Sequence, residues 1–121
     1  MHKSLNRLSF FIKVFLTLLI LLIIGFAIVS GSESFGGGIK GIIKNSPNAL
    51  PWLGLLIPVI IAWKYEKPGA IIITVLGLVV VYFFNTSPNF FMTTFIVTLT
   101  IPLCGIALWL IAIRKEKLDA I

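Results

Sequence analysis

Long apolar runs, separated by short polar or charged stretches, dominate the chain. No charged residue occurs between Lys13 and Glu33, and residues 14–29 are nearly all Leu, Ile, Val and Phe. Taken over residues 10–29, this run gives roughly 30 Å of helix at about 1.5 Å per residue, which matches the hydrocarbon core of a bilayer. The pattern predicts a first transmembrane span at residues 10–29.

The second apolar run, residues 49–63, is short for a span. Its helix is expected to begin near Pro47 and to continue through Lys64, whose long side chain can reach the lipid head groups. Pro58 lies inside this run and removes a backbone hydrogen-bond donor, which predicts a kink. We assign the second span to residues 47–64.

The last apolar stretch is too long for one span. After Lys67, 46 residues pass before the next charge, at Arg114. Residues 85–89 (Asn-Thr-Ser-Pro-Asn) have strong turn chemistry and divide this stretch. The sequence therefore predicts a third span at residues 68–84 and a fourth at residues 88–113.

Two connections between these spans carry recognisable patterns. Residues 30–48 are polar and glycine-rich, and the spacing of Ile and Lys at 39–44 allows a short amphipathic helix on the membrane surface. A flexible loop is the alternative. Lys64 to Gly69 is expected to form a tight charged turn, in which Glu66 pairs with Lys64 or Lys67 and fixes the hairpin.

The basic residues orient the spans. If the N-terminus is inside, eight Lys and Arg residues lie on the inner side and only two, Lys40 and Lys44, on the outer side. The inner eight are Lys3, Arg7, Lys13, Lys64, Lys67, Arg114, Lys115 and Lys117. Positive charge is enriched on the cytoplasmic side of membrane proteins, so both termini are predicted to be cytoplasmic.

The first apolar run has a second interpretation. A basic leader with Lys3, Arg7 and Lys13 precedes it, and small residues follow at 30–32, which is also the pattern of a cleavable signal peptide. No clear A-x-A cleavage site follows the apolar run. We therefore expect the segment to remain as an anchor.

Composition agrees with a membrane protein. The chain is 59% hydrophobic and 12% charged, against about 25% charged in an ordinary soluble domain. The net charge of +6 could suggest a nucleic-acid partner, but its basic residues lie at the edges of apolar runs rather than on one face. We predict an all-α polytopic membrane protein, one domain over residues 1–121 with four helices in two hairpins, whose partner is the lipid bilayer and not a nucleic acid.

The middle of each predicted span lacks Asp, Glu, Lys, Arg and His, and Lys13 and Lys64 lie toward span ends. The only histidine is His2, and the acidic residues lie in loops or near the ends: Glu33, Glu66, Glu116 and Asp119. Proton relays, metal sites and hydrolytic sites need convergent titratable groups. The sequence therefore predicts no catalytic, metal-binding or cofactor-binding residues, and no enzyme.

A threonine-rich stretch opens the fourth predicted span. Thr93, Thr94, Thr98 and Thr100 lie here, with Thr94 and Thr98 on one helix face. The stretch can be interpreted as a polar stripe that lines a pore or ligand pocket. The simpler interpretation is that these hydroxyls bond their own backbone or a neighbouring helix, which we favour.

Aromatic residues and glycines give two expectations for packing. Trp52, Trp63, Tyr65 and Trp109 lie toward span ends. Such amphipathic rings favour the head-group region. Small residues let helices approach closely, which is the expected role of Gly69, Gly77 and Gly105.

One short motif resembles a known family. It is the segment 61–69, with the sequence Ile-Ala-Trp-Lys-Tyr-Glu-Lys-Pro-Gly. Together with the apolar runs on either side, it resembles a family of small uncharacterised bacterial membrane proteins with a domain of unknown function. That family has Trp where this chain has Tyr65, and Gly-Gly where it has Gly69-Ala70. The resemblance implies four helices and a bacterial inner membrane, and it supplies no activity.

Two functions fit these observations. The first is a non-enzymatic membrane component, such as an assembly partner of an unknown membrane protein. The alternative is a transporter or channel for a neutral or lipophilic solute. It would be assembled as a homo-oligomer, because four short helices leave little room for a conduction pathway within one copy of the chain.

Overall fold

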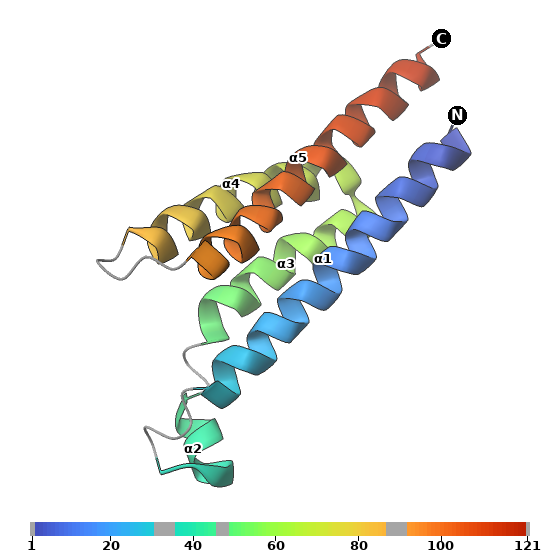
Figure 1. Cartoon of the computed structure of the whole chain (residues 1–121). Coiled ribbons are helices and arrows are strands. Elements are labelled where there is room, and N and C mark those ends of the chain that lie inside the picture. The colour runs from blue at the N-terminus through green and yellow to red at the C-terminus, as the bar shows by residue number, and fades with distance from the viewer. Residues whose placement is uncertain (1, 31–35, 46–48, 87–91, 121) are drawn as a thin grey trace.

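The computed structural model of the chain describes residues 2–30, 36–45, 49–86 and 92–120, and these form five helices and no strand. The helices are α1 (His2–Ser30), α2 (Gly38–Asn45), α3 (Leu50–Lys64), α4 (Glu66–Asn85) and α5 (Met92–Asp119) (Figure 1). The predicted all-α class is confirmed.

The four longer helices lie side by side, and the short α2 extends from the end opposite to the termini (Figure 1). α4 packs along α5 and against α3, while α1 contacts both α3 and α5. In the view of Figure 1, the α4–α5 pair and the α1–α3 pair diverge away from the termini. One apolar core joins all four helices and includes Leu16, Leu55, Ile73, Ile101 and Leu108.

Three of the described helices, α1, α4 and α5, are long and apolar enough to cross a membrane. The pair α2 and α3 passes the same criteria only when counted together, with a bend of 66° between the two helices. α3 alone has 15 residues. The structure therefore gives three to four candidate spans, and the prediction of four is confirmed only in this coarser form.

α1 and α4 extend beyond the predicted spans at both ends, and α5 extends beyond its span at the C-terminal end. α1 begins at His2, so the basic leader is helical, and α5 continues through the charged C-terminal segment to Asp119. The predicted start of the second span, at Pro47, lies outside the described residues, and α3 is seen from Leu50. The limits of the spans within a bilayer remain predictions.

The connection between α3 and α4 is shorter than predicted, because only Tyr65 separates the two helices. The Tyr65 amide donates to the Ile61 carbonyl (2.6 Å), and the Gly69 amide donates to the Tyr65 carbonyl (3.1 Å). The predicted tight connection is present, but Glu66 to Gly69 belong to α4 and not to a turn. Pro68 fits the first turn of α4 because the first amides of a helix have no intrahelical acceptor.

Three glycines allow close contact between helices, as the sequence predicted. A Cβ on Gly77 would lie 2.9 Å from the Pro102 nitrogen, and a Cβ on Gly105 would lie 2.6 Å from Thr74 Oγ1. Gly69 meets Ala62 in the same way. The backbones of α4 and its neighbours α3 and α5 therefore approach one another where a larger residue would not fit.

The segment before the second apolar run contains a helix, α2, which agrees with the amphipathic-helix alternative. Asn45, at its last turn, is 1% exposed, and its Nδ2 donates to the carbonyls of Ala27 (2.8 Å) and Ile28 (2.6 Å). These carbonyls belong to the last turn of α1, which has no intrahelical donors for them. Asn45 thus fastens α2 to the end of α1, while its position on a membrane surface remains a prediction.

We expect α1 to be retained in the mature protein. Leu16 and Ile20 of α1 have no exposed surface and belong to the common core, so loss of this helix would open the bundle. Intact-mass measurement of the membrane-extracted protein checks this. A mass lower by about the first thirty residues would show instead that the segment is a signal peptide.

We also expect both termini to be cytoplasmic, as the distribution of basic residues indicates. Single cysteines at positions 32 and 117, in a Cys104→Ser background, would be exposed to a membrane-impermeant thiol reagent outside intact cells. The cysteine at position 32 should be labelled and the one at position 117 should not. The opposite pattern would contradict the predicted orientation.

Candidate functional site

A cluster of polar and charged side chains gathers around Glu66 at the end of the bundle that holds the termini. The Ser9 hydroxyl donates to Glu66 Oε2 (2.9 Å), and Lys115 Nζ lies 3.1 Å from the same oxygen. Lys13 Nζ lies 3.6 Å from it. The Glu66 side chain is 18% exposed, so this cluster, which we call the Glu66 cluster, is largely shielded from solvent.

Helix geometry explains which partners Glu66 finds. Glu66 is the first residue of α4, where a negative charge is favoured by the helix dipole, and Lys115 lies near the C-terminal end of α5, where a positive charge is favoured. Ser9 and Lys13 are one turn apart on α1, so both face the same carboxylate. The carboxylate thereby joins α1, α4 and α5.

The predicted partners of Glu66 were wrong. Lys67 instead pairs with Glu116 of α5 (3.1 Å), and Lys64 lies over the Tyr65 ring, 5.5 Å from its centre. Lys67 is adjacent to Glu66 in a helix, and adjacent helical side chains do not face each other.

Aromatic contacts extend the cluster toward α3. Lys13 Nζ lies 5.1 Å from the centre of the Trp63 ring, and Trp63 Nε1 donates to the Thr17 hydroxyl (3.0 Å). A cation over an indole face is attracted by the electrons of the ring. Near the termini, His2 Nε2 also lies 3.1 Å from Asp119 Oδ1. This end of the bundle is therefore closed by contacts among all four longer helices.

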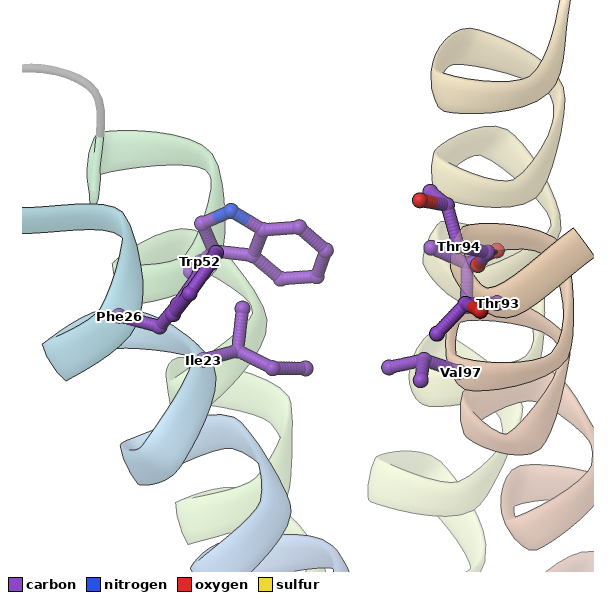
Figure 2. A pocket seen from close by; sticks show the side chains of 7 residues that line it. Ile23, Phe26, Trp52, Thr93, Thr94 and Val97 are labelled. Carbon is purple, nitrogen blue, oxygen red and sulfur yellow. Dashed lines mark hydrogen bonds between the residues drawn. The ribbon is translucent and has the colours of Figure 1, made fainter. Parts of the chain in front are cut away.

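The opposite end of the bundle contains a pocket of about 300 Å³ between α1, α3 and α5. Seven residues line it: Ile23, Phe26, Trp52, Thr93, Thr94, Val97 and Thr98. Figure 2 shows Ile23 and Val97 pointing toward one another across the gap, with the Trp52 ring on the side of Ile23 and the threonines on the side of Val97. One wall is thus aromatic and aliphatic, and the other carries hydroxyl groups.

Trp52 is a buried wall of this pocket. Its side chain is part of the core, 7% exposed, and its ring stacks on Phe84 with 5.1 Å between centres and 25° between planes. Trp63 and Tyr65 are exposed but Trp52 is buried, and the position of these rings in the head-group region stays a prediction. Trp52 is buried because Phe84, far away in sequence, offers its ring a stacking partner inside the bundle.

The threonine stretch makes the hydrogen bonds that the simpler interpretation predicts. Thr98 Oγ1 donates to the Thr94 carbonyl (2.7 Å) and accepts from Asn85 Nδ2 (3.0 Å), and Thr100 Oγ1 donates to the Ile96 carbonyl (2.8 Å). These are hydrogen bonds to the backbone of the same helix and to a residue of the neighbouring helix, as the simpler interpretation predicts.

Thr93, Thr94 and Thr98 also line the pocket. Next to Thr98, the buried Asn85 Oδ1 has no hydrogen-bond partner among the residues that the structure describes. The hydroxyl-bearing side of the pocket is therefore backed by a further polar group.

The two regions differ in their chemistry, because the Glu66 cluster is ionic and the pocket lining carries no charged side chain. Within the described ranges, no group of three or more His, Cys, Asp or Glu residues could hold a metal ion. The Glu66 cluster can hold helices together, and the pocket can bind an uncharged molecule. Sequence reasoning identified Glu66 and the threonines, but it missed Ser9, Lys115 and Asn85, whose partners depend on tertiary contacts.

Comparison with known proteins gives a family without an assigned activity. No curated protein and no solved structure matches the chain. A family model described as "Domain of unknown function (DUF7670)" matches residues 1–119, which confirms the resemblance to an uncharacterised family. The chain therefore belongs to the family of proteins that carry this domain of unknown function, DUF7670.

Proposed function

We propose that the protein is a non-enzymatic membrane component of the bacterial inner membrane that acts by assembling with a partner. The observation that supports this most is the division of the bundle into an ionic end and long apolar faces. The charges of the Glu66 cluster are used to join helices. The outer face of α1 remains exposed, with Phe11 at 66%, Leu22 at 71% and Phe26 at 72%.

Site-specific photo-crosslinking in native membranes tests this proposal. A photoreactive residue at Leu22, which is exposed, should give one protein adduct of discrete mass. The same residue at Leu55, which is 2% exposed, serves as the control and should react only within the chain. Lipid adducts alone at Leu22, Phe11 and Phe26, together with a monomer on native gels, would contradict an assembly role.

The pocket favours a second candidate function, an oligomeric transporter or channel for a neutral or lipophilic solute. Its volume of about 300 Å³ reaches the lower end of the range of about 300–1,000 Å³ that small-molecule sites occupy. Purified protein reconstituted into liposomes discriminates between the two functions. A permeability increase that depends on the amount of protein would support transport, and unchanged permeability would leave the assembly role as the better explanation.

A further inference from the structure

We propose that the pocket between α1, α3 and α5 binds a neutral, lipid-soluble molecule whose flat ring carries a carbonyl or hydroxyl group. This assignment goes beyond the assembly role, because it concerns a ligand site inside the bundle. The ligand site does not require a protein partner, but a partner on the outer face of α1 would cover the opening at Phe26.

The flat ring is inferred from the fixed position of Trp52. Its stacking on Phe84 and its low exposure of 7% hold the indole in place before any ligand arrives. Aromatic rings prefer stacked or edge contacts with other rings, and a ring that is already ordered loses little entropy when it binds. A planar ligand would therefore gain more from this wall than a flexible chain would.

The polar group is inferred from the opposite wall. Thr93 and Thr94 carry hydroxyls into the lining of an otherwise apolar pocket (Figure 2). A hydroxyl both donates and accepts a hydrogen bond, so it can serve a ligand carbonyl or a ligand hydroxyl. The bond between Thr98 Oγ1 and the Thr94 carbonyl holds this part of α5 in place.

The neutral character follows from the lining and from the place of the charges. None of the seven lining residues is ionisable. A charged ligand would lose its hydration without an opposite charge to pair with, which costs several kcal/mol in an apolar site. The Lys13, Glu66 and Lys115 charges are held together at the other end of the bundle.

Size and exposure indicate how the ligand enters. About 300 Å³ suits one compact ring system, so any long tail would remain outside the pocket. Phe26 lines the pocket and is 72% exposed, which places it at the opening on the outer face of α1. A ligand dissolved in the bilayer can reach the pocket from this face.

Tryptophan fluorescence tests the proposal with menadione, a compact quinone, as the probe. In a Trp63→Phe/Trp109→Phe background, Trp52 is the only tryptophan of the chain. Titration in lipid nanodiscs should give saturable quenching. Thr93→Val and Thr94→Val should each weaken binding by about three- to tenfold, the effect of one hydrogen bond.

Thr100→Val is the matched control, because Thr100 lies on the same helix but its hydroxyl bonds the Ile96 carbonyl outside the pocket. Its affinity should equal that of the parent. Thr93 is exposed, so Thr93→Val should fold normally. Equilibrium dialysis of the probe against nanodiscs with the unaltered chain and with Thr93→Val repeats the comparison without changing any tryptophan.

Three results would overturn the assignment. The first is quenching that rises linearly without saturation, as expected from partition into lipid. The second is equal affinity of the Thr93, Thr94 and Thr100 variants. The third is displacement of menadione by decanol, an aliphatic alcohol without a ring, at an equal concentration in the membrane.

Discussion

Gly105→Ala is expected to lower the free energy of unfolding by about 1–3 kcal/mol, the usual cost of forcing extra atoms into a packed interior. The added Cβ would lie 2.6 Å from Thr74 Oγ1, 2.8 Å from the Thr74 nitrogen and 3.0 Å from Ile73 Cγ2. The Thr74 hydroxyl cannot simply rotate away without cost, because it donates to the Ala70 carbonyl (2.8 Å). The two helices must move apart, and α4 and α5 form the main contact of the bundle.

Gly54→Ala is the control for this prediction. A Cβ on Gly54 would meet nothing within 4 Å, so the change should be neutral or slightly stabilising because alanine favours helix more than glycine does. Unfolding by SDS in mixed micelles, followed by circular dichroism, measures both variants. Equal stability of the Gly105 and Gly54 variants would mean that α4 and α5 do not approach as closely as described.

Glu66→Gln is expected to destabilise the protein by about 1.5–3 kcal/mol, the range for hydrogen bonds to charged groups. The amide would remove the negative charge that lies between Lys13 and Lys115, whose side chains are 13% and 20% exposed. Two shielded ammonium groups would then face each other without compensation, which is the costly outcome when one partner of a shielded ion pair is lost. The contact between α1 and α5 should loosen most.

Glu116→Gln provides the comparison. Glu116 pairs with Lys67, but these side chains are 59% and 42% exposed, and an exposed pair contributes only about 0–1 kcal/mol. Thermal stability in detergent and any membrane phenotype should be measured on both variants. A structural role predicts a lower melting temperature for Glu66→Gln with the phenotype partly retained. Loss of the phenotype at an unchanged melting temperature would assign Glu66 a direct functional role instead.

Local patterns were sufficient to predict the helices and some of their contacts. Apolar length identified the long helices, and small side chains identified Gly69, Gly77 and Gly105 as points of close approach. Apolar length and small side chains are properties of a single segment, so they can be recognised in the sequence without knowing which helices pack against it. The orientation of the chain in a membrane rests on the same kind of local signal and stays a prediction.

The partners of the polar residues could not be predicted because they come from distant parts of the chain. Glu66 meets Ser9, which is 57 positions away, and Lys115, which is 49 positions away. Sequence proximity favoured Lys64 and Lys67 as partners of Glu66. Because α3 ends at Lys64 and α4 begins at Glu66, these two lysines face other neighbours. The stacking of Trp52 on Phe84 depends in the same way on the packing of α3 against α4.

The short length of α3 has a consequence for the lipids around the protein. Its 15 residues extend over about 22 Å, whereas the hydrocarbon layer of a typical bilayer is about 30 Å thick. The 29 residues of α1 far exceed that thickness. If α3 crosses the bilayer without α2, acyl chains next to it must compress or tilt, while those beside α1 need not, and the bilayer is then locally thinned on one side of the bundle.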